Sequence, residues 1–247
     1  MTMNNLVNFL TNILVIIVPI LHGFEGVELP KVERSLTKNG FHRELTTKIT
    51  FGKSLFKNFS NCDVMVLELL PPGAYIDPFQ LRTLREFGGP RFICDPVDVE
   101  QPEYLASSLN VSLYTSALTD DMDDLMTSVT IPIHLRYHRP SSSVEYTLVS
   151  IPKPLLLLSC TAKDYTGAVI GEEDLSCTSA TLIKCRWTMV EYLIDDDDDD
   201  IKVTVPVGQT SHTILVVVGT ILMTVAGSFI ILLKTLKFKH GIKEKVS

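Results

Sequence analysis

Twenty consecutive residues without a charged side chain, 214–233, constrain this chain more than any other feature. A helix rises about 1.5 Å per residue, so such a segment spans the ~30 Å hydrocarbon core of a bilayer. Five lysines and one glutamate follow within residues 234–247, whereas the preceding flank (209–212, QTSH) has no lysine or arginine. The positive-inside rule therefore predicts a single transmembrane helix at 214–233, a cytosolic basic tail at 234–247 and a lumenal or extracellular N-terminal part.

The tail also bears on how the protein is anchored and where it resides. A glycosylphosphatidylinositol attachment signal ends in its apolar segment, whereas here a basic tail follows, so we expect a retained helix. Lys245 and Lys243 stand third and fifth from the carboxyl end, an arrangement that resembles a dilysine retrieval signal of the endoplasmic reticulum. Ordinary stop-transfer lysines are the alternative interpretation.

A second apolar run, residues 6–21, lies near the N-terminus and has the length of a secretory signal core. We expect a signal peptide over residues 1–23, with cleavage near Gly23 or Gly26. Its N-terminal part has no lysine or arginine, so an uncleaved signal anchor is the alternative.

The charge of the remaining chain is acidic. Residues 25–213 carry 17 basic and 28 acidic side chains, a net charge of 17 − 28 = −11. A nucleic-acid-binding domain of this size is expected to be basic, so we expect no nucleic acid among the partners. Six aspartates, 195–200, could bind calcium or, with the aspartates of 120–124, form a sugar-nucleotide site. A homopolymer of like charges repels itself, so we predict a solvated acidic stem over 195–213.

Cysteines and sequons fit a lumenal domain. An oxidising compartment permits disulfides, and the odd cysteine count leaves at least one thiol unpaired within the chain. The five candidates are Cys62, Cys94, Cys160, Cys177 and Cys185, and we expect a bridge within the last three. Two Asn-x-Ser sequons predict N-glycosylation at Asn58 and Asn110. No Cys-x-x-Cys pair occurs, so we expect no metal and no other cofactor.

The pattern of residues 24–194 indicates a mainly β domain. Short runs rich in branched and aromatic residues, broken by Pro, Gly and Ser turns, predict strands at 62–70, 129–137, 144–151 and 155–160. We expect residues 144–148 to pair back on 129–139 as a hairpin, and a short helix near 78–87. Repeated short strands favour a lumenal β-sandwich, followed by one C-terminal transmembrane helix.

No catalytic motif is apparent. The chain has no Gly-x-Ser-x-Gly elbow, no phosphate-binding glycine loop and no His-Glu-x-x-His. Residues 131–138 read as a strand in which His134, Arg136 and His138 share one face and Tyr137 takes the other. We interpret this stripe as a partner-binding or salt-bridging surface, with His134, Arg136 and Tyr137 as the candidate binding residues.

Two segments resemble the PIG-X family, the small subunit of GPI mannosyltransferase I. They are residues 72–81 (PGAYIDPFQL) and 131–140 (IPIHLRYHRP), with 98–104 (DVEQPEY) between them. The resemblance covers about residues 40–165 and the layout of one C-terminal span with a short basic tail. It implies a non-catalytic, single-pass type I protein of the endoplasmic reticulum membrane. Its implied partner is PIG-M, the multi-spanning subunit that adds the first mannose to the glycosylphosphatidylinositol precursor.

Two other functions fit the same topology. A single-pass lumenal cargo receptor would carry a coiled-coil stem, and no sustained heptad precedes residue 214. A glycosylated surface receptor would be β-rich, but it predicts exposure at the cell surface and not retrieval. We therefore expect an accessory subunit that binds and stabilises a membrane-embedded enzyme.

Overall fold

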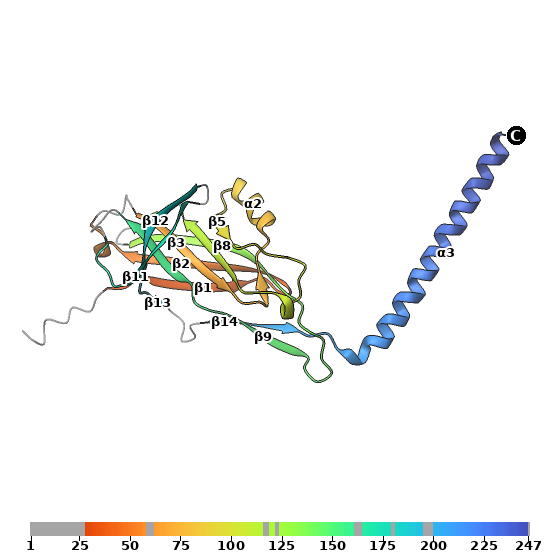
Figure 1. Ribbon diagram of the computed structural model, residues 1–247, viewed down its shortest axis with the longest axis horizontal. Coiled ribbons are helices and arrows are strands. Elements are labelled where there is room, and N and C mark those ends of the chain that lie inside the picture. The colour runs from red at the N-terminus through yellow and green to blue at the C-terminus, as the bar shows by residue number, and fades with distance from the viewer. Residues whose placement is uncertain are drawn as a thin grey trace, which may run out of the picture.

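The computed structural model describes most of the part that precedes the C-terminal helix, and the helix itself. The described residues are 28–57, 62–115, 119–121, 124–160, 165–178, 181–194 and 200–246. The expected signal peptide and Asn58 lie outside them. Figure 1 shows a β domain from which one long helix projects.

Two sheets face each other in the domain. The first sheet has the order β13 (Leu193–Ile194), β1 (Lys31–Thr37), β2 (His42–Gly52), β8 (Asp124–Leu135) and β4 (Ala74–Tyr75), and β7 (Thr119–Asp121) also pairs with β8. The second sheet has the order β11 (Val169–Thr178), β12 (Thr181–Val190), β10 (Leu155–Cys160), β3 (Cys62–Leu70), β6 (Leu109–Thr115) and β5 (Arg91–Cys94). The prediction of a mainly β, sandwich-like domain is confirmed.

Alternation along the strands builds the core between the sheets. In β2 the buried residues Leu45, Thr47, Ile49 and Phe51 occupy odd positions, and the even-numbered residues between them are partly exposed. Val66 and Leu70 of β3 meet the apolar ones in the same cluster. Each such side chain contributes about 1.5–3 kcal/mol on burial, so this alternation fixes which face of each strand turns inward.

The outer face of the second sheet is partly covered by its own hairpin. Met65, Tyr114, Leu157 and Trp187 are all buried and form a separate apolar cluster there. Tyr114 Oη and Trp187 Nε1 both donate to the carbonyl oxygen of Ser176 in β11, at 3.0 and 3.2 Å. These bonds hold the β11–β12 hairpin to the sheet and satisfy both buried polar groups.

One ion pair is buried between the sheets. Arg34 Nη2 of β1 donates to Glu68 Oε2 of β3 at 2.7 Å, and the two side chains are only 3% and 0% exposed. Thr47 of β2 donates to the other carboxylate oxygen at 3.2 Å, and Arg34 also donates to the Pro152 carbonyl. Burial raises the pKa of Glu68, although Arg34 and Thr47 oppose the shift. The network links three strands across the sandwich.

Two disulfides are present, and one thiol remains free. Cys62 bonds to Cys160, whose residues lie opposite each other on β3 and β10 and are 98 positions apart in the chain. Cys177 bonds to Cys185 across the β11–β12 hairpin, which places one bridge within the expected trio. Cys94 at the end of β5 is free and half-buried, and burial raises its pKa.

A third, two-stranded sheet leads to the membrane helix, and it overturns two expectations. Strand β9 (Tyr146–Ile151) pairs with β14 (Ile201–Pro206) and not with residues 129–139, so the expected hairpin is wrong. Strand β14 also falls within the segment 195–213 that we expected to be a solvated stem. Its Val203 and Val205 are buried against Val149, and this burial orders residues 201–206.

Helix α2 (Pro78–Glu86) matches the helix expected near 78–87. Asp77 caps its first turn through a 2.8 Å bond from the Phe79 N–H, and Pro78 occupies the first position. The helix ends at Gly88, whose φ of +88° lets the chain turn, while Gly89 N–H donates to the Leu84 carbonyl.

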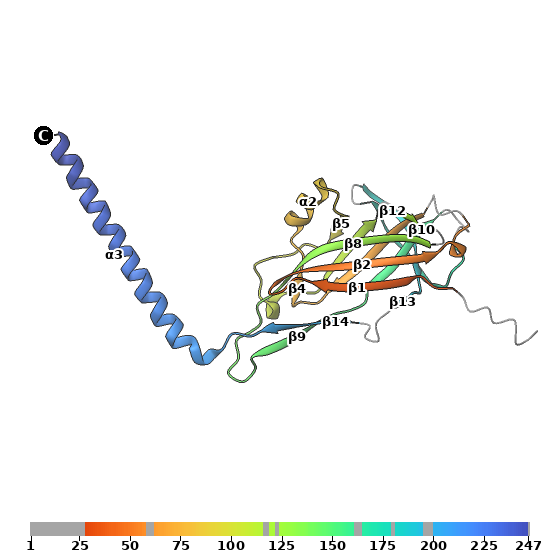
Figure 2. The same cartoon turned by 180° about the vertical axis from the view of Figure 1, so that it is seen from behind.

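Helix α3 (Thr213–Val246) follows a short 3-10 turn, η4 (Thr210–His212). Its apolar stretch, Thr210–Lys237, has a mean hydropathy of 2.5 and is not buried against the domain. Figure 2 shows the helix leaving the domain beside β9 and β14. This confirms one C-terminal helix long enough to cross a membrane, and its backbone continues helical through the basic tail.

Candidate partner-binding site

The candidate residues gather where β8 ends. His134 lies near the end of β8, where it pairs with Tyr75 of the short strand β4. Strand β8 ends at Leu135, so Arg136, Tyr137 and His138 leave the strand, although we expected them to extend it. The Arg136 N–H still donates to the Gly73 carbonyl at 2.9 Å, which holds this exit against the start of β4.

His134 and Arg136 share a face, as expected, because both contact the ring of Tyr75. The Arg136 guanidinium lies 4.4 Å from the Tyr75 centroid, a cation–π contact. His134 stacks on Tyr75 at 5.1 Å and meets the ring of His42 edge-on at 4.7 Å. We call this row of four side chains (Arg136, Tyr75, His134 and His42) the stacked column.

Arg136 is buried, so of the two interpretations of this stripe, partner binding or a role within the domain, the second fits this residue. Its side chain is 4% exposed, and Nη1 donates to the Gln101 carbonyl. Burial lowers its pKa, and the neighbouring Tyr75 and Asp98 oppose that shift. Arg136 therefore braces the stacked column from inside and cannot itself meet a large partner.

Two opposing influences act on His134. Burial and the neighbouring His42 lower its pKa, whereas Asp77 raises it. Its Nε2 lies 2.8 Å from the Gln80 side-chain oxygen of α2. An amide oxygen only accepts hydrogen bonds, so in this contact Nε2 carries the proton and donates to Gln80.

Tyr137 points to the other side and is open to solvent. It is 72% exposed, and its ring packs against Phe41 at a centroid distance of 4.8 Å. Its carbonyl accepts a 3.0 Å bond from the N–H of Glu103, which brings the 3-10 turn η3 (Glu103–Leu105) alongside. Tyr104 and Leu105 of that turn are 46% and 64% exposed.

The side chains after Tyr137 complete this surface. The Arg139 guanidinium lies 4.7 Å from the Tyr104 ring centroid, and His138 Nδ1 lies 3.4 Å from Glu103 Oε2. We call the exposed set the aromatic patch: Tyr104, Leu105, Tyr137 and Arg139. Exposed aromatic side chains beside an arginine are enriched at protein interfaces, so the patch is suited to binding a protein partner.

The aromatic patch is tied to the start of the membrane helix. Two residues beyond Arg139, the Ser141 N–H donates to the Gly208 carbonyl at 2.9 Å, and Thr210 N–H donates back to Ser141 at 3.0 Å. Helix α3 begins at Thr213. The patch therefore sits at the end of the domain from which α3 leaves.

Several residues of the site carried no sequence signal of their own. Phe41 comes from a distant part of the chain and reaches the site only through folding, whereas Tyr104 ends the segment 98–104 that resembles the PIG-X family. Glycine is required at position 73 because the Val149 side chain lies close to it: a Cβ there would be 2.8 Å from Val149 Cγ2. Tyr75 and Gly73 did lie in the segment 72–81 that resembles the PIG-X family, and that resemblance was the signal that could have identified them.

The remaining expected sites are spread over the molecule. Asn110 lies exposed on β6, where its side chain donates to Asp95 at 2.9 Å. Lys243 and Lys245 lie within the last turns of α3. Within the described part of the chain, no three His, Cys, Asp or Glu side chains are grouped as a metal site.

Comparison with known proteins identifies relatives along nearly the whole chain. A family model described as PIG-X / PBN1 matches residues 38–236, which include the domain and most of α3's apolar stretch. The Mus musculus protein "GPI alpha-1,4-mannosyltransferase I, stabilizing subunit" is 30% identical over 213 residues, 85% of this chain and 82% of that protein. The Homo sapiens protein of the same name is 29% identical over 216 residues, 85% of this chain and 81% of its own.

A more distant relative is fungal. "Protein pbn1" of Schizosaccharomyces pombe is 22% identical over 181 residues, 70% of this chain and 49% of that protein. No solved structure matches the chain. The family match covers both candidate motifs, the aromatic patch and the membrane helix, and it extends over far more than half of the sequence. The chain belongs to the PIG-X / PBN1 family.

Proposed function

We propose that this protein is the stabilising, non-catalytic subunit of a GPI mannosyltransferase I and so acts in glycosylphosphatidylinositol-anchor biosynthesis. The observation that carries the proposal is the similarity to mammalian stabilizing subunits over 85% of the chain. Its partner is the multi-spanning catalytic subunit, a protein like PIG-M.

The architecture supports an accessory role. A mannosyltransferase that uses a lipid-linked donor needs a site built within the membrane, and this chain offers one exposed apolar helix among its described residues. A subunit that binds only the folded enzyme stabilises it by mass action, by about 2.7 kcal/mol when its concentration is a hundred times Kd. Such a gain suppresses unfolding and degradation of the partner without any chemistry of its own.

The aromatic patch is the proposed lumenal contact, with Tyr137 as its most exposed ring. His134 and Arg136 support it indirectly, because the stacked column holds the exit from β8 that carries Tyr137. The proposal places this domain in the lumen of the endoplasmic reticulum, with glycans on Asn58 and Asn110 and a cytosolic tail. Lys243 and Lys245 are the proposed retrieval residues.

Deletion and rescue test the proposal. Cells that lack the gene should lose the catalytic subunit and GPI-anchored surface proteins, and the full-length wild-type chain should restore both. Tyr137→Ala should restore each at least threefold less well, at equal expression of the chain itself. Phe79→Ala on α2 is the matched control, since Phe79 is 70% exposed but lies outside the patch. Normal GPI anchoring in the deletion strain would refute the function.

A further inference from the structure

The first sheet has an open edge. Strand β8 pairs with β7 at Met126 and with β4 at His134, but no described strand joins its outer side over residues 127–133. These seven residues span about 23 Å at roughly 3.3 Å each. An open strand edge presents unpaired N–H and C=O groups, and proteins normally blunt or cover such edges.

The alternation of backbone hydrogen bonds along β8 shows which N–H and C=O groups point away from β2. Leu135 N–H donates to Phe41 on the β2 side, whereas Arg136 N–H donates to Gly73 on the β4 side. Odd-numbered residues of β8 therefore bond to β2, and even-numbered ones point their backbone outward. Ser128 and Thr130 each offer an N–H and a C=O there, while Pro132 offers only a carbonyl.

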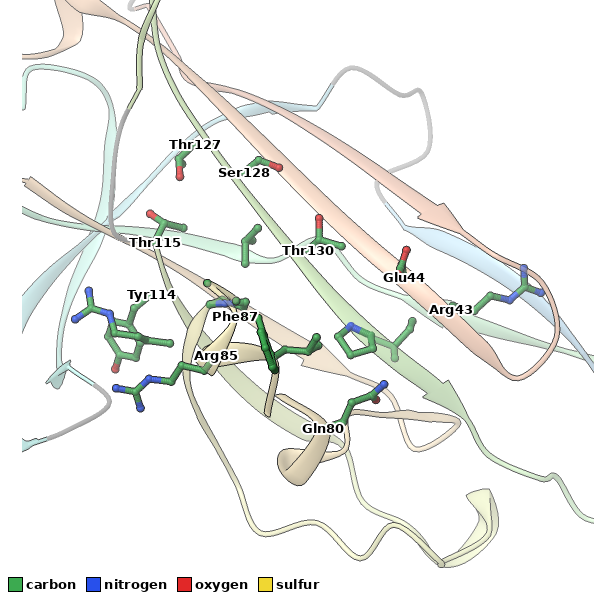
Figure 3. A pocket seen from close by; sticks show the side chains of 18 of the residues that line it. Arg43, Glu44, Gln80, Arg85, Phe87, Tyr114, Thr115, Thr127, Ser128 and Thr130 are labelled. Carbon is green, nitrogen blue, oxygen red and sulfur yellow. The ribbon is translucent and has the colours of Figure 1, made fainter. Parts of the chain in front are cut away.

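This edge lines a groove and does not face open solvent. A cleft of about 1090 Å³ runs along it, with α2 and β5 forming the opposite wall. Figure 3 shows Ser128 and Thr130 on the β8 side, with Arg85 and Phe87 from the end of α2 across from them. Pockets for small ligands commonly enclose about 300–1,000 Å³, so this groove is long enough for an extended chain segment.

The groove is basic although the domain is acidic. Four cations line it, against one carboxylate: Lys38, Arg43, Arg85 and Arg91 against Glu44. Lys38 and Glu44 pair with each other at 2.6 Å, and the Arg43 guanidinium donates to the carbonyl oxygens of Gly40 and Lys38, so Arg85 and Arg91 carry the positive charge that a ligand in the cleft would meet. Against a net charge of −11 for residues 25–213, this local excess of positive charge selects an acidic occupant.

We propose that the groove binds an extended, acidic lumenal segment of the catalytic subunit by strand addition to β8. The segment pairs with Ser128, Thr130 and the Pro132 carbonyl, and its carboxylates meet Arg85 and Arg91. Main-chain bonds supply affinity in this mode of recognition, and flanking side chains supply specificity. The inference rests on the proposed function, since it assigns a second contact with the same partner.

Photo-crosslinking tests the groove in the full-length chain, co-expressed with the catalytic subunit in membranes. A benzophenone amino acid at position 130 should crosslink to a lumenal peptide of that subunit that contains Asp or Glu. The same probe at Glu33, which is 50% exposed on β1, should not crosslink. A crosslink to a glycolipid or to a peptide without acidic residues would overturn the inference.

Two substitutions then test charge and backbone separately. Arg85→Glu should reduce the crosslink from position 130 at least tenfold, whereas Arg82→Glu should not, because Arg82 lies on the same helix but outside the groove. In a chain with the probe at position 128, Thr130→Pro removes one outward N–H and should also reduce crosslinking. Unchanged crosslinking in Arg85→Glu would show that the groove is not the contact.

The outcomes separate this inference from the proposed function. If the catalytic subunit does not co-purify with the wild-type chain, the proposed function fails. If it co-purifies and crosslinks through Tyr137 but never through position 130, the function stands and the groove proposal fails. In that case Pro132 and the cover of α2 serve only to protect the edge.

Discussion

At the scale of single residues, two buried arginines, Arg34 and Arg136, are stabilised in different ways. Arg34 and Glu68 satisfy each other between the sheets, whereas Arg136 stacks on Tyr75 and donates to a backbone carbonyl. A buried charge is costly unless it is paired and hydrogen-bonded. The first arrangement links strands of the core, and the second positions a surface ring, so their loss should have different consequences.

Glu68→Gln should lower the free energy of unfolding by about 3 kcal/mol, because it leaves the Arg34 charge buried and unpaired. The double variant Arg34→Met with Glu68→Leu should recover most of that loss, since burial of the ions is itself unfavourable. Urea unfolding of the detergent-solubilised chain measures both. Glu33→Gln is the control, and it should cost less than about 1 kcal/mol because its pair with Lys48 is exposed.

His134 should make stability depend on pH. Burial and His42 lower its pKa in the folded protein, so the unfolded chain binds the proton more readily. Stability is therefore complete above the ordinary histidine pKa of about 6.5 and falls as the pH drops toward the folded value. Comparing Tm at pH 7 and pH 5 measures this loss, which His134→Asn should reduce. His212→Asn, outside the stacked column, should keep the wild-type slope.

At the scale of elements, the two disulfides constrain loops of very different length. The chain-entropy model gives about 4.7 kcal/mol for a loop near 100 residues and roughly 2.5 kcal/mol for one near eight. Cys62–Cys160 and Cys177–Cys185 have sequence separations of 98 and 8. Replacing the first pair by serine should therefore destabilise the domain by about 2 kcal/mol more than replacing the second. Equal losses in urea unfolding would contradict the entropic explanation.

Local patterns predicted the elements better than their pairing. The cap at Asp77 and the alternation in β2 and β8 are local, so α2 and the sandwich could be expected from sequence. The partner of β9 could not, because β14 lies about fifty residues away and follows six aspartates that read as a stem. The pairing is evident only in the folded structure, where Val203 and Val205 are buried in one cluster with Val149 of β9.

The site was predictable to the same limited extent. His134 and Tyr137 lie on opposite sides, as predicted, although β8 ends at Leu135 and Tyr137 stands beyond it. The burial of Arg136 was not predictable, because Tyr75 and Gln101 reach it from separate segments of the chain. The open edge of β8 was also beyond local patterns, since it depends on where the short strands β4 and β7 stop.

At the scale of the whole molecule, the domain is held to its membrane helix by a short ordered connection. Val207 N–H donates to Glu145, and Ser141 bonds to both Gly208 and Thr210, within a few residues of the start of α3. This connection fixes the height and direction of the aromatic patch relative to the bilayer. Stabilisation of a membrane-embedded partner should then depend on the connection as well as on the patch.

Inserting Gly-Ser-Gly-Ser between Gln209 and Thr210 should leave the domain folded but lower the level of the catalytic subunit at least twofold. The insertion separates Ser141 from Thr210, and a flexible linker lowers the effective concentration of the patch at its target. Immunoblotting of the partner measures the effect, and an unchanged Tm shows that the domain is intact. The same insertion after Leu233, on the far side of the span, is the control. A partner level unchanged by the first insertion would show that the rigid connection is dispensable.

Because β1 pairs with β13, the first sheet can be completed only late in the synthesis of the chain. Lys31 of β1 lies beside Leu193 of β13, so the first strand of the domain acquires one of its neighbours only after nearly all later strands have been made. Contacts between such distant segments slow folding. The nascent domain is therefore expected to keep one edge of β1 unpaired until residues 193–194 have been made. Assembly with the enzyme is thus expected after translation and not during it.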